Sequence, residues 1–94
     1  MLDQNKVTEV FLTIFPSASD IYELIYYISA EEWGSKDIIR NAPVGTYSAM
    51  QIAQYFTNVF FEYKLFESKE FKKYLLSRRP FRRDLINSIF DLKD

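Results

Sequence analysis

Residues 47–63 read YSAMQIAQYFTNVFFEY, and this stretch carries the clearest structural signal in the chain. Its apolar residues recur three and four positions apart, as on one face of a helix, and its alanines allow a neighbouring helix to approach closely. Val59-Phe60-Phe61 would also suit a strand, but it lies inside the helical period and no alternating run of strand length occurs elsewhere. The sequence therefore predicts an all-α fold. The residues of the predicted inner face are Ile52, Phe56, Val59, Phe60 and Tyr63, with Ala49 and Ala53 beside them.

Further amphipathic segments surround this helix. Pro16 and Pro80 separate neighbouring segments, because proline disfavours helix at the residue before it and suits a first helical position. Ser17, with Asp20 three residues on, has the spacing of a capping box, and Ser19 is an alternative N-cap. The predicted helices are approximately residues 3–15, 17–29, 36–40, 47–63, 68–79 and 80–90.

These helices predict one compact six-helix bundle that spans residues 1–94 as a single interaction domain. A chain of this length buries roughly 60–65% of the surface that it exposes when unfolded, which is enough for one core. The apolar residues of the last predicted helix are Phe81, Leu85, Ile86, Ile89 and Phe90.

The composition argues against several chemistries. The chain has no cysteine and no histidine, which removes thiolate ligands, the commonest general base and the commonest transition-metal ligand. Gly34 and Gly45 are isolated, so no glycine-rich phosphate loop exists. We therefore predict a protein that is not an enzyme and that holds no metal and no cofactor. No secretory signal is recognisable and no apolar run approaches the ~18–20 residues of a membrane span, so a cytoplasmic protein is expected.

The charges are sorted along the chain although the net charge is only −1. Residues 64–83 carry eight basic and two acidic side chains, and residues 1–63 carry three basic and eight acidic ones. We expect the basic residues to form a cationic flank and the acidic ones an anionic flank on another side of the molecule, each free to bind a counterpart on a second copy or a cognate helical domain. The predicted cationic residues are Lys69, Lys72, Lys73, Arg78, Arg79, Arg82 and Arg83. The predicted anionic residues are Asp20, Glu23, Glu31, Glu32 and Asp37.

Other interpretations of the basic segment remain open. It could be an ordinary solvated face, or residues 64–83 could bind the phosphates of a nucleic acid. A sequence pI near 5.4 is low for a dedicated nucleic-acid domain, and no helix-turn-helix signature stands out. A small phage or host inhibitor protein could use the same charges to occupy another protein's site.

Aromatic residues provide a second indication of an interface. Tyr22, Tyr26 and Tyr27 cluster on the second predicted helix, and Trp33 follows shortly after. Their rings could border the core while the hydroxyl groups reach water, or they could anchor a partner, since aromatic residues and arginine are enriched at interfaces.

The order of these features resembles that of the bacterial effector-associated domains, small all-helical modules likened to the Death superfamily. The resemblance implies an adaptor that pairs effectors with sensors in prokaryotic immune or conflict systems through homotypic contacts. Weak pairwise binding strengthened by multivalency is then expected, and no catalytic residue is carried over. Where such domains often have a glycine between the long helix and the fifth, this chain has Tyr63-Lys64-Leu65. The matching features are Phe15-Pro16, Ile21 to Ile28, Ile52 to Phe60, Leu65 to Leu75, and Pro80 with Leu85 and Ile89.

Overall fold

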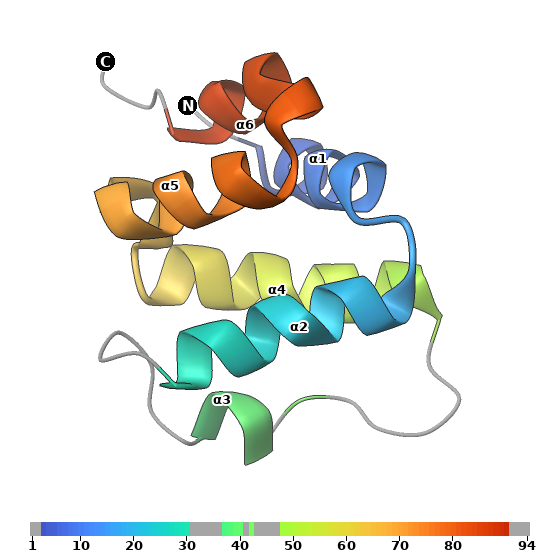
Figure 1. Cartoon of the computed structure of the whole chain (residues 1–94). Coiled ribbons are helices and arrows are strands. Elements are labelled where there is room, and N and C mark those ends of the chain that lie inside the picture. The colour runs from blue at the N-terminus through green and yellow to red at the C-terminus, as the bar shows by residue number, and fades with distance from the viewer. Residues whose placement is uncertain (1–2, 31–36, 41, 43–47, 91–94) are drawn as a thin grey trace.

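The regular elements of the chain are all helical in a computed structural model that describes residues 3–30, 37–40, 42 and 48–90 (Figure 1). This confirms the predicted all-α class, with no strand among the described residues. Five helices have eight residues or more, whereas the predicted third helix is a single turn. The elements are α1 (Gln4–Ile14), α2 (Ala18–Ala30), α3 (Asp37–Arg40), α4 (Ala49–Glu62), η1 (Leu65–Glu67), α5 (Lys69–Arg78), η2 (Pro80–Arg82) and α6 (Arg83–Phe90), where η denotes a 3-10 turn.

Side-chain caps explain where two of the helices begin. The Ser48 hydroxyl accepts a hydrogen bond from the Gln51 backbone N–H at 3.2 Å, and the Gln51 side-chain oxygen accepts one from the Ser48 backbone N–H at 2.9 Å. This reciprocal capping box starts α4 two residues later than the sequence predicts. At α2 the Ser17 hydroxyl accepts from the Asp20 backbone N–H at 3.2 Å, so Ser17, and not Ser19, fills the capping role.

The turn that ends α4 contains a backbone conformation that favours glycine. Lys64 has φ 53° and ψ 43°, the left-handed region, and it is the only non-glycine residue with positive φ in the described ranges. This conformation costs an L-residue roughly 1–2 kcal/mol. It turns the chain from the end of α4 into η1.

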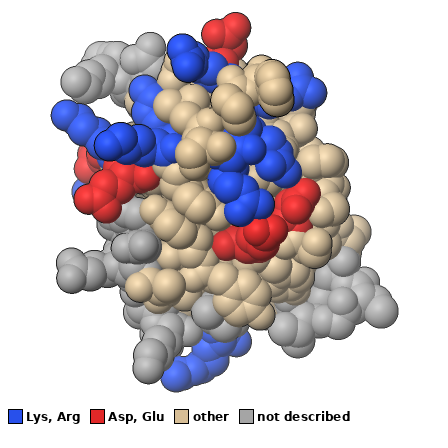
Figure 2. Space-filling model, viewed as in Figure 1, with Lys and Arg blue, Asp and Glu red and all other residues tan. Residues whose placement is uncertain are grey.

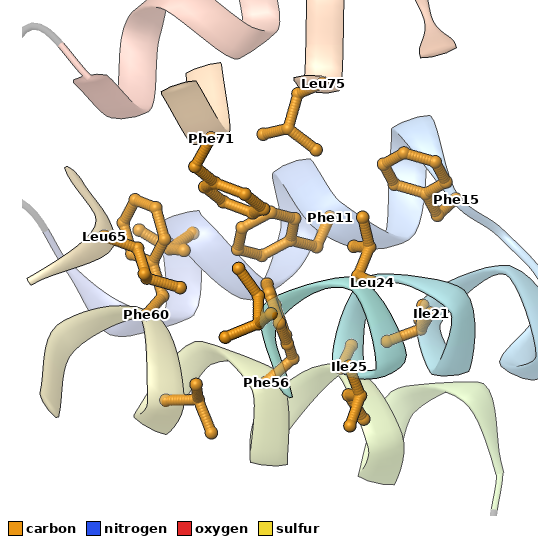
Figure 3. Close-up of a cluster of buried hydrophobic side chains, with 14 of the residues drawn as sticks. Phe11, Phe15, Ile21, Leu24, Ile25, Phe56, Phe60, Leu65, Phe71 and Leu75 are labelled. Atoms are coloured by element: carbon orange, nitrogen blue, oxygen red, sulfur yellow. The ribbon is translucent and has the colours of Figure 1, made fainter. Parts of the chain in front are cut away.

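The core is built around aromatic rings from three helices (Figure 3). The ring of Phe11, on α1, meets the rings of Phe56 and Phe60, on α4, edge to face at centroid distances of 5.1 and 5.4 Å. Phe71 brings α5 to the same cluster at 5.9 Å from Phe56. All four rings are 0% exposed. Edge-to-face pairs of this kind contribute about 0.5–1.5 kcal/mol beyond the burial of their area.

One polar contact lies inside this core and joins α1 to α4. The hydroxyl groups of Thr8 and Thr57, both buried, are 2.7 Å apart. Thr57 donates its proton to the backbone carbonyl of Ala53 at 2.8 Å, so the Thr8 hydroxyl is the donor in the contact between the two threonines. The pair therefore leaves neither hydroxyl without a partner, as a buried polar group requires.

The helices pack on both sides of α4. Helices α1 and α2 contact α4 directly, and α6 contacts both α5 and α1. Figure 1 shows α5 and α6 above α4, and α3 below it. The Tyr55 hydroxyl of α4 donates to the Ile38 carbonyl of α3 at 2.7 Å and attaches this single turn to the bundle. The Cα radius of gyration is 12.2 Å, close to the roughly 12 Å of a compact domain of this length.

The prediction that Phe81 belongs to the last α-helix is wrong, and its side chain is 95% exposed. After Pro80 the chain forms the 3-10 turn η2, and α6 begins only at Arg83. A 3-10 turn advances about 120° per residue instead of 100°, so Phe81 leaves the register that buries Ile86 and Ile89.

Candidate protein-interaction surface

Arg78 is paired within the molecule. Its Nη2 atom donates to both carboxylate oxygens of Glu23, on α2, at 3.0 and 3.3 Å. The same guanidinium lies 5.9 Å from the centre of the Tyr74 ring. The hydrogen bond to Glu23 raises the pKa of Arg78, and the electrostatic interaction with Tyr74 raises it further. Both partners remain partly exposed, so this ion pair contributes only about 0–1 kcal/mol to stability.

Arg79 joins three helices. Its Nε atom donates to the Ile14 carbonyl, at the C-terminal end of α1, at 2.7 Å. Its Nη2 atom donates to Asp20, in the first turn of α2, at 3.4 Å, and its guanidinium lies 4.5 Å from the centre of the Phe15 ring. Arg79 is itself the C-cap residue of α5. The residue therefore cross-links the bundle, since its planar group satisfies a helix-end carbonyl and covers an aromatic ring at once.

The prediction of a cationic and an anionic flank on different sides is wrong for these four residues. The C-terminal end of α5 lies beside the first half of α2, so Arg78 meets Glu23 and Arg79 meets Asp20. The partners are 55 and 59 residues apart in sequence, and only the packing of the two helices brings them together. Arginines and carboxylates that satisfy one another in this way offer less to a second molecule than free ones.

The remaining predicted basic residues point into solvent. Lys69, Lys73, Arg82 and Arg83 are exposed and Lys72 is half-buried. None of the five forms an ion pair with a carboxylate in the described part of the chain. Figure 2 shows Lys and Arg side chains gathered over the upper part of the molecule, with carboxylates touching only the edges of the group.

Three predicted acidic residues cannot be placed. Glu31 and Glu32 lie outside the described residues, and of Asp37 only the backbone, in α3, is described.

Residues 80–83 form an exposed turn that we call the knuckle. Phe81 is its most exposed large apolar residue, and Arg82 and Arg83 follow directly, both exposed. The Arg82 backbone N–H donates to the Arg79 carbonyl at 3.0 Å, which closes the 3-10 turn. Of the three large apolar residues that are exposed in the described ranges, Phe81 is by far the most so, against 59% for Tyr26 and 47% for Met50. The sequence offered a hint, since an aromatic residue directly after proline and before two arginines fits poorly into a buried helix face.

The tyrosine cluster divides between the two roles expected of it. The ring of Tyr27 stacks on that of Tyr74 at a centroid distance of 3.7 Å and an angle of 6°, joining α2 to α5. Tyr22 is half-buried against the core, whereas Tyr26 is exposed. Trp33 lies outside the described residues. Two of the three tyrosines are thus structural, and Tyr26 alone is free to contact a partner.

An open depression lies at the other end of α5 from the knuckle, and we call it the hollow. Its volume is about 590 Å³. One tyrosine, one serine, two lysines and two glutamates line it. The residues lining it are Tyr63, Lys64, Glu67, Ser68, Lys69 and Glu70.

Two searches of the described residues bear on other kinds of site. They contain no group of three or more acidic side chains placed to hold a metal ion. No helix among them is both long enough and apolar enough to cross a bilayer. Comparison of the chain with protein-family models, with curated proteins and with solved structures gave no match.

Proposed function

We propose that this chain is a protein-interaction module, an adaptor that binds a second copy of itself or a cognate helical domain through the knuckle. One observation carries the proposal: Phe81 is 95% exposed and stands beside two arginines that have no ion-pair partner among the described residues. Aromatic residues and arginine are the side chains most enriched at the energetic centres of protein interfaces.

The internal ion pairs narrow the proposed surface. Arg78 and Arg79 are already paired with Glu23 and Asp20. Partner binding is therefore assigned to Phe81 and to the two arginines that follow it. The exposed lysines of α5, Lys69 and Lys73, would add long-range attraction to an acidic partner and raise the rate of association. They would contribute little to affinity at physiological salt.

The further assignment is to a Death-like, effector-associated adaptor that acts in the cytoplasm and couples an effector to a sensor in a prokaryotic immune or conflict system. It rests on the resemblance described above. Its support is the position of Pro16 and Pro80, which fall between consecutive helices as the resemblance implies; α3, the third helix of that pattern, is a single turn.

The expected affinity of a single contact is modest. Full burial of a phenylalanine side chain contributes about 1.5–3 kcal/mol, and each rim ion pair about 0–1 kcal/mol. Together these contributions reach at most about 5 kcal/mol, which does not exceed the roughly 4–15 kcal/mol that bringing two molecules together costs. Useful strength would therefore come from several contacts in one assembly.

The test reverses the charges of the knuckle. We expect Arg82→Glu with Arg83→Glu to abolish self-association and capture of a cognate helical domain while the circular dichroism spectrum stays unchanged. The matched control is Lys6→Glu with Arg40→Glu, which changes the net charge equally at exposed sites on α1 and α3. Association that survives the knuckle variant, or that falls equally in the control, contradicts the proposal.

The same variants test the rival interpretations. If residues 64–83 bind nucleic acid, labelled DNA or RNA should bind at about 150 mM salt, with affinity falling steeply as salt is added. A protein that inhibits another protein's site should bind that target while it remains monomeric. Either result would replace the adaptor proposal.

A further inference from the structure

We infer that the knuckle, together with Lys72 and Lys73 of α5, binds the anionic surface of a lipid membrane. The inference goes beyond the proposed function and does not depend on it, because it gives the knuckle a second ligand of a different chemical class. Three features carry it: an aromatic side chain that extends into water, a surplus of unpaired positive charge around it, and a backbone turn that holds both in place.

The aromatic side chain is that of Phe81. At 95% exposure it touches almost nothing on its own molecule, so the whole ring is available for insertion between lipid headgroups. Segments that lie on a membrane bury Phe, Trp or Leu about 5–10 Å deep, at the boundary between headgroups and acyl chains, and keep Lys and Arg at the headgroups. The order Phe81-Arg82-Arg83 supplies both parts within three residues.

The positive charge comes from two neighbouring elements. Arg82 and Arg83 are exposed at the junction of η2 and α6, while Lys73 is exposed and Lys72 half-buried on α5. The two lysines lie only about 8–9 Å along the helix from its last residue, which is within the screening length of about 10 Å at 0.1 M salt. In Figure 2 the basic side chains gather on the side of the molecule where Figure 1 places α5 and α6. All four cations can therefore act on one patch of headgroups.

The neighbouring carboxylates do not cancel this charge. Asp84, which is exposed, is the only carboxylate in residues 71–84. Apart from Arg78 and Arg79, which are paired with α2, four cations against one carboxylate give this stretch a net charge of +3. Clusters of four or more Lys and Arg beside a membrane-binding segment are typical of proteins that bind anionic lipid, and each such charge strengthens binding about fivefold.

The knuckle holds its exposed conformation before any ligand binds. Pro80 restricts its own backbone, and the Arg82 N–H closes the turn by donating to the Arg79 carbonyl at 3.0 Å. The Arg79 side chain in turn donates to the Ile14 carbonyl at the end of α1. Phe81 therefore needs no refolding to enter the headgroup layer, and a preorganised anchor loses less conformational entropy on binding.

The experiment measures cosedimentation of the full chain with two kinds of vesicle. One holds phosphatidylcholine alone, and in the other about three lipids in ten are phosphatidylserine, an anionic lipid of the cytoplasmic leaflet. We expect half-saturation of the anionic vesicles near roughly 1 mM accessible lipid, since one phenyl ring has less apolar area than the myristoyl chain that alone gives about 10⁴ M⁻¹. Binding to the neutral vesicles should be at least about tenfold weaker.

Matched pairs of variants assign the binding to this surface. Phe81→Asp and Met50→Asp each add one negative charge at an exposed apolar side chain, and Arg82→Glu and Arg40→Glu each reverse one exposed arginine. Arg40 is on α3, which Figure 1 shows on the other side of α4 from α5 and α6. We expect the two knuckle variants to bind the anionic vesicles at least about tenfold more weakly and the two controls to change binding by less than about threefold. Circular dichroism checks that all four variants fold.

A fourth variant measures insertion directly. Phe81→Trp keeps an aromatic ring suited to the membrane interface, so it should bind as well as the unmodified protein to within about threefold. The unmodified chain contains one tryptophan, Trp33, which supplies the background signal. Acyl chains that carry bromine should quench the fluorescence of Phe81→Trp more strongly than that of the unmodified protein, because the introduced ring lies beside them.

Several results would overturn the inference. Equal binding to neutral vesicles, equal effects of Phe81→Asp and Met50→Asp, or equal quenching in Phe81→Trp and the unmodified protein would show that the ring does not enter an anionic bilayer. Binding of labelled DNA that is lost in Arg82→Glu, with no binding to vesicles, would assign the charges to nucleic acid. Failure on vesicles with capture of a cognate helical domain retained would leave the proposed function standing. Vesicle binding that depends on Phe81 in a protein that captures no such domain would support the inference and refute the proposed function.

Discussion

Replacement of Arg79 by alanine tests whether this residue is a structural cross-link, as its contacts indicate, or part of a binding surface, as the charge pattern predicts. Its guanidinium donates to the Ile14 carbonyl at 2.7 Å, to the Arg78 carbonyl at 3.0 Å and to Asp20 at 3.4 Å. It also covers the ring of Phe15, which is only 1% exposed. Arg79→Ala removes all four contacts at once.

The expected loss can be worked out from these contacts. A hydrogen bond from a charged donor contributes about 1.5–3 kcal/mol, the cation–π contact about 0.5–2 kcal/mol, and the partly exposed ion pair about 0–1 kcal/mol. Because the contacts share one group they do not add fully, and we expect Arg79→Ala to lower the free energy of unfolding by about 2–4 kcal/mol. A domain of this length has about 5–14 kcal/mol in total. The midpoint of thermal unfolding should fall by about 8–30 °C.

The neighbouring residue provides the control. Arg78→Ala removes the same charge one position earlier, but Arg78 and Glu23 are 35% and 48% exposed and make no contact with a helix-end carbonyl. It should cost no more than about 1 kcal/mol. Arg79→Lys keeps the charge but loses the planar fork, so we expect it to lie close to Arg79→Ala. Urea unfolding followed by circular dichroism at several protein concentrations measures all three variants and separates stability from association.

The outcome that refutes this reasoning is a small effect at Arg79. If Arg78→Ala and Arg79→Ala destabilise the protein equally, or if Arg79→Ala leaves stability unchanged and abolishes partner binding, Arg79 belongs to the binding surface. The hydrogen bonds of Arg79 would then contribute nothing measurable to the free energy of unfolding.

Three further predictions concern the bundle itself. Lys64→Gly should raise the free energy of unfolding by about 0.5–1 kcal/mol in urea titrations, because glycine tolerates a φ of 53°, and Lys64→Val should lower it. Thr57→Val should cost about 1–3 kcal/mol, because it leaves the buried Thr8 hydroxyl without its acceptor, and the double variant that adds Thr8→Val should recover part of that loss; no recovery would mean that the hydroxyl pair is not coupled. Burial raises the pKa of Tyr55 above its ordinary value of 10.0, so the folded state holds this proton more tightly than the unfolded chain. The resulting stability is fully present below about pH 10 and is lost as the pH rises through the folded pKa, so Tyr55→Phe should lose less stability than the unmodified protein over that range.

Much of the secondary structure follows from local signals that need no partner elsewhere in the chain. The apolar spacing in residues 47–63 predicted α4 to within two residues at its start and one at its end, and Pro16 and Pro80 marked real breaks. Ser17 caps the helix expected of it, and Ser68 caps α5. The error at Phe81 has a local origin as well. A helical period assumes 100° per residue throughout, and the 3-10 turn after Pro80 violates that assumption over three residues.

The candidate site was harder to predict, because it depends on which charges find partners. Eight basic residues in one segment look equivalent in sequence, yet the structure separates Arg78 and Arg79, which are paired, from Arg82 and Arg83, which are not. No local pattern distinguishes them, since the carboxylates that decide the matter come from α2. The exposure of Tyr26 beside the stacked Tyr27 is decided in the same way, by the approach of α5.

The order of amino acids alone is therefore enough to define an all-helical chain with its helices, most of its caps and one apolar face on each, because these depend on neighbours a few residues apart. The packing of those helices determines which charges cancel and which ring remains in water, because Glu23 and Arg78 meet across 55 residues of chain. Surface chemistry is a property of the assembled bundle, since a side chain is free only when no other element comes within reach of it.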